Sequence, residues 1–151
     1  MEVVIEDASI RDLDRLYHIE RQCFKEEAFA REQIASLLAD YNTISLVAKG
    51  NGEAIGFVIG MIHFERNATI GHILTIDVLP KYRQRGIGMK LLVEIERIFK
   101  KKGIQACSLE VREDNSAALS LYRKLGYRRI GKLKNYYGKA ADGIYLRKAL
   151  T

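Results

Sequence analysis

The chain has 151 residues, a length typical of one domain, and 48% of them are hydrophobic while 29% are charged. This composition excludes a disordered tail, a collagen-like fibre and a disulfide-stapled miniprotein. The longest apolar run, residues 54–62, is far shorter than the ~20 residues that a membrane span needs. The N-terminal residues lack the pattern of a secretory signal, and two cysteines suit reduced thiols. We therefore expect one cytoplasmic domain over residues 1–151.

Charge is distributed unevenly along the chain, which carries a net charge of +6. Residues 1–40 contain five basic and ten acidic side chains, whereas the remainder contains twenty basic and nine acidic ones. A basic surface suits nucleic acid or a polyanionic cofactor such as a nucleotide. The asymmetry predicts two faces that meet two different partners.

The first forty residues predict a strand followed by two helices. A short strand at residues 3–5 precedes a helix that Ser9 begins, with Asp12 three residues later in the capping-box pattern. Residues 23–30 then form an irregular link. One side of the second helix is expected to be apolar, formed by Ile34, Leu37, Leu38 and Tyr41.

Strands and helices alternate through the rest of the chain. Residues 44–48 and 54–62 read as strands, and the Asn51-Gly52 pair between them predicts a hairpin. Further strands are expected at 69–78, 107–111, 127–132 and 143–150, and further helices at 89–102 and 115–125. This order predicts an α/β domain with one mixed sheet.

The most informative stretch is VLPKYRQRGIGM, residues 78–89, where a strand ends, a basic loop follows and a helix begins. Gly86 and Gly88 allow the backbone to turn sharply and to approach a ligand closely. The free N–H groups and the dipole of the helix then form an anion site suited to pyrophosphate. Two common nucleotide-binding motifs do not fit this stretch. The Rossmann pattern G-x-G-x-x-G fails because Leu91 stands at its third glycine, and the P-loop pattern fails because Gly-Lys-Ser/Thr does not occur in the sequence.

Two motifs carry a family resemblance. The pattern R-x-x-G-x-G at residues 83–88 resembles motif A of the GNAT superfamily of acetyl-CoA-dependent N-acetyltransferases, and residues 109–127, LEVREDNSAALSLYRKLGY, resemble its motif B. This form, together with residues 134–137 and 142–145, is similar to RimI-type and archaeal protein N-terminal acetyltransferases. The resemblance implies the GNAT fold: a mixed, mostly antiparallel sheet of about seven strands, flanked by four helices and splayed in the middle to hold acetyl-CoA.

The resemblance further implies transfer of acetyl from acetyl-CoA to the α-amino group of protein N-termini, without a metal. It assigns Glu110 as the general base and Tyr122 as the general acid. Alternation along the strand sets Glu110 opposite Leu109 and Val111. An α-amino group has a pKa of ~7.7–8 against ~10.4 for lysine, so it is more easily deprotonated. Two other interpretations stay open: Glu110 as a solvated glutamate and Tyr122 as a core aromatic.

Acetyl-CoA is expected to run along one strand like an added strand and to place its pyrophosphate on the main-chain N–H groups of residues 84–89. Asn115 either contacts this cofactor or only caps a helix. The expected cofactor-binding residues are Ile76, Asp77, Val78, Arg83, Gln84, Arg85, Gly86, Ile87, Gly88, Met89 and Asn115.

The peptide is expected to enter from the other side, between the 23–30 link and the loop with Tyr136 and Tyr137. Two adjacent tyrosines can form hydrogen bonds with a peptide backbone without requiring a particular side chain on the peptide. Glu26 or Glu27 meets the positive N-terminus or is simply solvated.

His72 has two interpretations that the sequence leaves open. It is either a second base beside Glu110 or a buried, satisfied histidine, and it is expected to share a strand face with Leu74, Ile76 and Val78.

The expected partners are protein N-termini, including those of ribosomal proteins, for a monomer or weak dimer with no membrane contact. Nucleic acid is expected only through ribosome association. One alternative is a GNAT enzyme that acetylates lysine side chains or a small-molecule amine. A second, non-enzymatic alternative is a basic RNA- or ribosome-binding module, which residues 100–102 and 123–134 would supply with charge.

Overall fold

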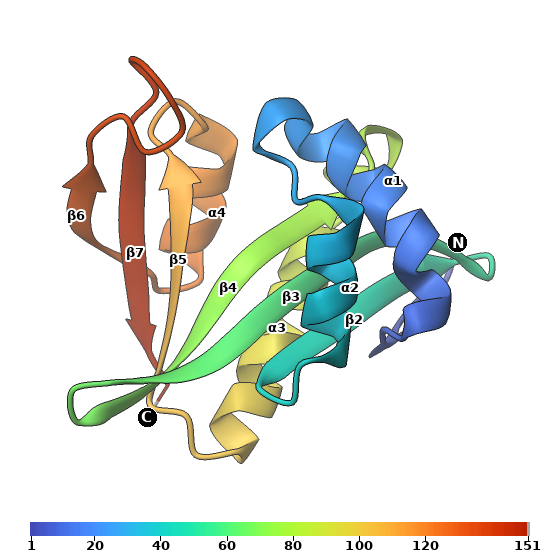
Figure 1. Cartoon of the computed structure of the whole chain (residues 1–151), viewed down its shortest axis with the longest axis horizontal. Coiled ribbons are helices and arrows are strands. Elements are labelled where there is room, and N and C mark those ends of the chain that lie inside the picture. The colour runs from blue at the N-terminus through green and yellow to red at the C-terminus, as the bar shows by residue number, and fades with distance from the viewer. Residues whose placement is uncertain (151) are drawn as a thin grey trace.

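The structure is a computed structural model that describes residues 1–150, and it contains one seven-stranded sheet with helices on both faces (Figure 1). The strands are β1 (Val3–Asp7), β2 (Thr43–Gly50), β3 (Glu53–Glu65), β4 (Ala68–Val78), β5 (Ala106–Arg112), β6 (Arg128–Leu133) and β7 (Gly143–Ala149). The helices are α1 (Leu13–Phe24), α2 (Arg31–Ala39), α3 (Ile87–Lys101) and α4 (Ser116–Lys124), with short 3-10 turns at Ile10–Asp12, Lys25–Glu27 and Pro80–Tyr82.

The strands follow the order β1-β2-β3-β4-β5-β7-β6 across the sheet. Every neighbouring pair is antiparallel except β4 and β5, which run parallel because the chain crosses over through α3 between them. This arrangement confirms the expected mixed, mostly antiparallel sheet.

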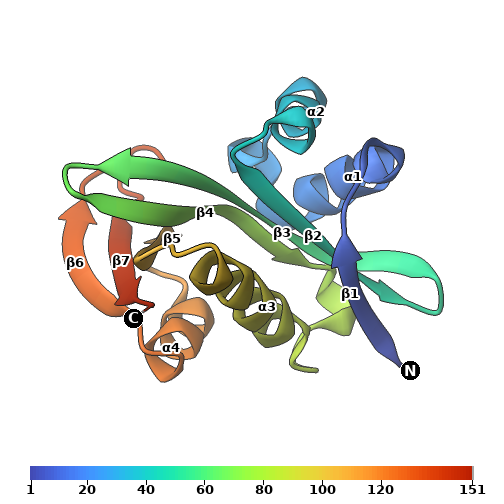
Figure 2. The same cartoon turned by 90° about the horizontal axis from the view of Figure 1, so that it is seen from below.

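Helices α1 and α2 lie on one face of the sheet, and α3 and α4 lie on the other (Figure 2). Each face has its own core because successive strand residues point to opposite sides: Phe57 packs under α1, whereas its neighbour Val58 packs toward α3. Phe99 of α3 lies so close to the sheet that a Cβ at Gly60 or Gly71 would come within 2.7 or 2.5 Å of its ring. These two glycines therefore let α3 dock tightly.

Several local expectations are confirmed. Asn51 and Gly52 both have positive φ, 55° and 78°, as a tight hairpin turn between β2 and β3 requires. Ser9 and Asp12 form the capping box.

Strands β1 and β3 extend two and three residues beyond their expected ends, and two helix boundaries also differ from expectation. Tyr41 is 99% exposed, because α2 ends at Ala39 and the next residues turn into β2. Helix α3 begins at Ile87, two residues before the expected start, since the left-handed Gly86 already caps it and a glycine at position 88 is tolerated in a first turn. Within residues 1–150, no helix is long and apolar enough to cross a membrane.

Candidate active site

Strands β4 and β5 part in the middle of the sheet (Figure 1). They pair only where residues 70–73 face residues 106–109. Beyond that point, the β4 edge at residues 74–78 has no partner strand on this side. A free strand edge can accept an extended ligand as an added strand. The splay expected beside Glu110 is therefore present, and Glu110 lies where it opens.

The N-terminus of α3 offers an anion site at the end of β4. Gln84 and Gly86 both have positive φ, 63° and 79°, and the first helical bond runs from the Lys90 N–H to the Gly86 carbonyl. The N–H groups of residues 87–89 precede that bond and so have no acceptor within the helix. Apart from its chain neighbours, a Cβ built on Gly86 would have no heavy atom within 4 Å, so the space beside this turn is open. The residues fit a diphosphate.

The basic side chains around this turn separate into two groups. Lys81 and Arg85 are exposed and lie over the ring of Tyr82, at 5.2 and 5.5 Å from its centroid. The guanidinium of Arg83 instead turns toward α1, where its Nε donates to the Val78 carbonyl at 3.0 Å. Arg83 thus ties the end of β4 to α1, where its Nη2 lies 3.5 Å from the Cys23 sulfur, while the residue itself stays exposed.

Glu110 lies on β5 and contacts His72 of β4. The His72 Nε2 is 2.8 Å from Glu110 Oε1, and its Nδ1 is 2.6 Å from the hydroxyl of Ser108. The Glu110 side chain keeps 19% of its surface exposed, whereas Ser108 is fully buried. Ser108 is a contact that the sequence reasoning missed, although it shares the Glu110 face of the strand by simple alternation.

This chain of contacts sets the histidine tautomer. Beside an ionised Glu110, which only accepts hydrogen bonds, a neutral His72 ring donates from Nε2, and its Nδ1 then accepts the Ser108 hydroxyl proton. His72 in this form is a donor that orients the carboxylate, and the atom free to take a proton from an amine is on Glu110.

The expected strand face of His72 is wrong in part. A β-bulge at Leu74 interrupts the pairing of β4 with β3, so both Leu74 and Thr75 face α1 and α2. After the bulge the alternation is shifted, and Ile76 and Val78 pack toward α3. His72 therefore shares its face with Leu74 but not with Ile76 or Val78.

Tyr122 approaches the splay from the α4 side of the sheet. It is only 7% exposed and packs edge-on against Tyr127, with ring centroids 5.8 Å apart. Burial raises the pKa of Tyr122 well above its ordinary value. The phenol therefore stays protonated and is able to donate a hydrogen bond.

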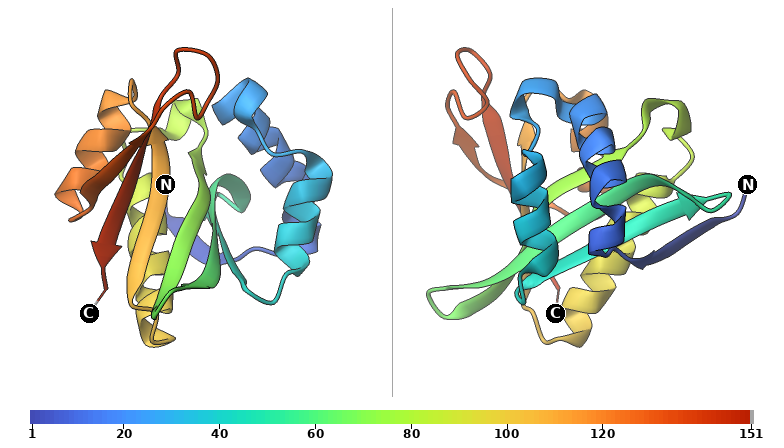
Figure 3. Two further views of the ribbon diagram at one scale, coloured as in Figure 1. Left: turned by 60° about the vertical axis from the view of Figure 1, so that its left-hand side comes forward. Right: turned by 45° about the vertical axis from the view of Figure 1, so that its right-hand side comes forward.

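The side of the splay where a peptide is expected contains a residue that the sequence reasoning missed. Arg112 follows Glu110 on the same face of β5, pairs with Glu27 of the link, and lies 5.8 Å from the Tyr137 ring centroid. Figure 3 shows the link and the tyrosine loop at the same end of the molecule. Glu27, one of the two candidates to meet an N-terminus, is therefore already ion-paired, although Arg112 shares its single charge with Asp114 at 3.1 Å.

The two tyrosines of this loop stack edge-to-face, with centroids 4.9 Å apart. Tyr136 is 53% exposed, whereas Tyr137 is more buried. Burial raises the pKa of both phenols, and the negative charge of Glu110 adds to this effect. Both phenols therefore stay protonated and able to donate hydrogen bonds.

The remaining candidates have structural contacts of their own. Asn115 caps α4 by accepting the Ala118 N–H at 3.1 Å. Burial is the main cause that raises the pKa of the Cys23 thiol to about 11 and that of Cys107 to about 12, so neither thiol is an activated nucleophile. Within residues 1–150, no group of three or more His, Cys, Asp or Glu side chains converges to hold a metal ion.

Comparisons with known proteins agree with this geometry. A model of the acetyltransferase (GNAT) family matches residues 13–127. The chain is 31% identical over 155 residues to an N-alpha-acetyltransferase of Sulfurisphaera tokodaii, with 97% of this chain and 92% of that protein covered. The chain belongs to the acetyltransferase (GNAT) family, as the two motifs predict.

Solved structures extend the comparison. The ribosomal-protein-S18-alanine N-acetyltransferase of Escherichia coli superposes with a TM-score of 0.89 at 25% identity, covering 99% of this chain and 95% of that one. The PaiA N-acetyltransferase of Thermoplasma acidophilum, solved in complex with coenzyme A, superposes with a TM-score of 0.76 at 25% identity and covers 99% of both chains. The expected fold is thereby confirmed.

Proposed function

We propose that this enzyme transfers acetyl from acetyl-CoA to the α-amino group of protein N-termini, by direct attack in a ternary complex. The observation that carries the proposal is the position of Glu110. Its carboxylate lies where β4 and β5 part and is 2.8 Å from His72 Nε2, on the same strand as Arg112, whose guanidinium lies 5.8 Å from the Tyr137 ring centroid. A base in this position can remove a proton from an amine that enters between the link and the tyrosine loop.

Glu110 takes the amine proton, directly or through a water molecule, and the phenol of Tyr122 donates a hydrogen bond to the departing sulfur. Acetyl-CoA supplies the thioester. Its proposed contacts are the β4 edge at Ile76, Asp77 and Val78, the charges of Arg83 and Arg85, the side chain of Asn115, and the main-chain N–H groups of Gln84, Gly86, Ile87, Gly88 and Met89. Holding both reactants in line supplies much of the acceleration.

His72, Glu27, Tyr136 and Tyr137 are the proposed peptide-side residues. Ribosomal proteins are proposed among the substrates because the similar E. coli enzyme is named for one. We further propose a monomer or weak dimer in the cytoplasm, where the two free cysteines would stay reduced.

The function is tested with acetyl-CoA and short peptides that begin with Ala, Ser, Met or Glu and contain one lysine. We expect turnover on peptides with free N-termini and none on the same peptides with blocked N-termini. Activity that survives blocking would assign a lysine acetyltransferase instead. Turnover confined to small amines in a parallel assay would assign a small-molecule enzyme.

Replacing Tyr122 by Phe is expected to lower kcat by about 10–10²-fold, because the departing thiolate loses a donor whose bond to a charged acceptor contributes about 1.5–3 kcal/mol. Because the pKa of Tyr122 is raised, the kcat of the wild type should show no descending limb from this phenol below a pH of about 10. Steady-state kinetics across pH measure both effects.

Tyr127→Phe is the matched control for that variant. It removes the hydroxyl of a second buried tyrosine, which lies away from the splay and donates a hydrogen bond to Glu96 across 2.7 Å. This variant should therefore lower the melting temperature but leave kcat unchanged. Equal kcat losses in both variants would show that Tyr122 only fills the core.

A further inference from the structure

Two carboxyl groups are buried together between α1 and β4, and the mechanism above uses neither side chain. Glu20 of α1 is 1% exposed and Asp77 of β4 is 2% exposed. Thr75, 5% exposed, lies between them. Carboxylates are almost never fully buried unless they are paired, so this cluster requires an explanation.

Counting hydrogens shows that the cluster holds an extra proton. Thr75 Oγ1 lies 2.8 Å from Glu20 Oε1 and 2.6 Å from Asp77 Oδ1, both hydrogen-bond distances. A hydroxyl has one hydrogen and can donate to only one of these oxygens, while an ionised carboxylate donates to none. One of the two carboxyls must therefore be protonated and donate to Thr75.

Asp77 is the better holder of this proton. Its Oδ2 is buried and has no hydrogen-bond partner within residues 1–150, which costs less for the carbonyl oxygen of a neutral acid than for a charged carboxylate. Burial, followed by the charge of Glu20, raises its pKa well above the usual range. The other groups that face it are Cys23 of α1, Tyr122 of α4 and the opposing Arg83.

The second carboxylate oxygen of Glu20 accepts a hydrogen bond from the 23–30 link. This atom, Oε2, accepts the main-chain N–H of Phe29 at 3.0 Å. The bonds thus run in one direction, from the Asp77 carboxyl to the Thr75 hydroxyl, then to Glu20, which also receives the N–H of Phe29. This chain connects the strand edge proposed for the cofactor to the link proposed for the peptide.

We propose that Glu20, Thr75 and Asp77 form a proton-sharing clamp that positions the 23–30 link for the incoming peptide. The clamp rests on the proposed function only in naming the peptide as the substrate that the link meets. Its physical basis is the single shared proton: with it the two carboxyls attract through Thr75, and without it two buried negative charges repel.

The clamp has a pH dependence whose sign follows from the proton count. Between the pKa of Asp77 in the unfolded chain and its higher pKa in the folded protein, the folded state binds one more proton. The free energy of unfolding therefore decreases as pH rises across that window. Asp77→Asn keeps a permanent donor to Thr75 and has no proton to lose, so its stability should vary less with pH.

The first test needs no activity. Infrared difference spectra of wild type against Asp77→Asn at neutral pH should show the C=O band of a protonated carboxylic acid in the wild type alone. Hydrogen exchange at the Phe29 amide should be faster in Thr75→Val, which lacks the bridging hydroxyl, and unchanged in Thr75→Ser. The clamp would be overturned by a wild-type spectrum without the carboxylic acid band. Equal exchange at the Phe29 amide in wild type, Thr75→Val and Thr75→Ser would also overturn it.

The second test is kinetic. Thr75→Val should raise the KM of the peptide about tenfold, the scale of one hydrogen bond to a charged group, with the KM of acetyl-CoA within about twofold. Thr75→Ser should restore the peptide KM. As pH rises, the wild type loses the shared proton and Asp77→Asn does not, so the ratio of the peptide KM in the wild type to that in the variant should increase. Titration of the peptide amine affects both proteins equally and cancels in this ratio.

The two proposals fail in different ways. If peptides are not acetylated at all, the proposed function fails while the infrared and exchange experiments still decide whether the clamp exists. If peptides are acetylated but Thr75→Val leaves their KM unchanged, the positioning role of the clamp is wrong and the function stands.

Discussion

Glu110→Gln is expected to lower kcat by about 10²–10³-fold and to leave the Kd of acetyl-CoA unchanged. The amide has the shape of the carboxylate and its oxygen can still accept the hydrogen that His72 donates across 2.8 Å, so the geometry of the site is kept. The amide cannot take a proton, so the amine is no longer deprotonated as it attacks. Single-turnover kinetics and calorimetric titration with acetyl-CoA measure the two quantities separately.

Glu113→Gln is the matched control, because Glu113 follows β5 and pairs at the surface with Lys132 at 3.2 Å. It makes the same chemical change on the same segment and should leave kcat within about twofold of the wild type, as surface ion pairs contribute little. A Glu110→Gln variant as active as this control would remove Glu110 from the mechanism and leave His72 as the candidate base.

The sequence could predict the features that depend on short-range patterns. Asn51-Gly52 determines a hairpin because both residues tolerate positive φ, and Gly86 predicts the turn into α3 for the same reason. The position of Glu110 on the outward face of its strand followed from alternation alone. Both motifs predicted the family and the fold that the comparisons show.

The bulge at Leu74 could not be predicted, because one extra residue in a β-rich run leaves no mark on its composition. It inverts the alternation of everything after it, and this places Asp77 in the α1 core rather than facing the opposite layer. The long-range contacts of Arg112 and Glu20 were equally hidden, since each joins segments far apart in the chain. The sequence thus supplies the candidates for the reacting groups, whereas tertiary packing determines how the link is held.

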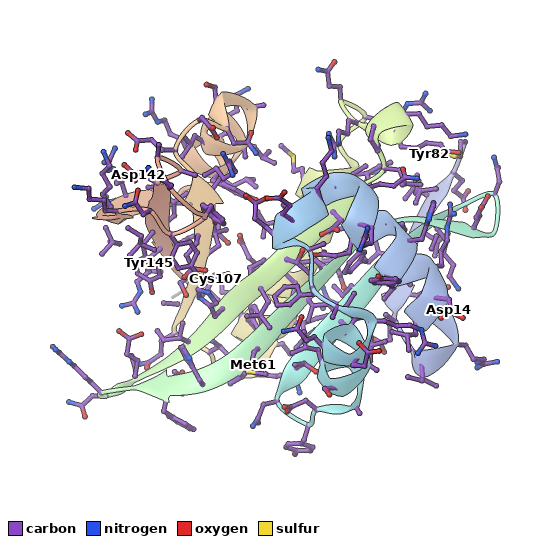
Figure 4. All side chains as sticks on the ribbon, turned by 45° about the horizontal axis from the view of Figure 1, so that its top comes forward. Asp14, Met61, Tyr82, Cys107, Asp142 and Tyr145 are labelled. Carbon is purple, nitrogen blue, oxygen red and sulfur yellow. The ribbon has the colours of Figure 1, made fainter. Side chains whose placement is uncertain are left out.

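The uncovered half of the sheet is a second feature that only packing decides. Helices α1 and α2 lie over β2 to β4, and β7, where Tyr145 is labelled, is left open on that side (Figure 4). His72 stacks toward Tyr145 at 6.4 Å and toward His63 at 6.2 Å on this open surface. Glu110 is therefore reachable from solvent on the face opposite α3 and α4, which agrees with entry of the two substrates from opposite sides.

Gly86→Val is expected to abolish measurable binding of acetyl-CoA and, with it, turnover. The new side chain would enter the open space beside Gly86, at the turn where the diphosphate is proposed to lie on the N–H groups of residues 87–89. The variant also forces a β-branched residue to a φ of 79°, a strain of about 1–3 kcal/mol. Loss of binding must therefore be separated from loss of fold.

Gly103→Val separates them, because Gly103 follows the same helix at its other end with an almost identical φ of 81° and equally open surroundings. Both substitutions should lower the melting temperature by similar amounts, since the backbone strain is the same. Only Gly86→Val should lose binding in a calorimetric titration with acetyl-CoA, because only that end of α3 presents free N–H groups. Normal affinity in Gly86→Val, or equal loss in both variants, would mean that the diphosphate does not lie on this turn.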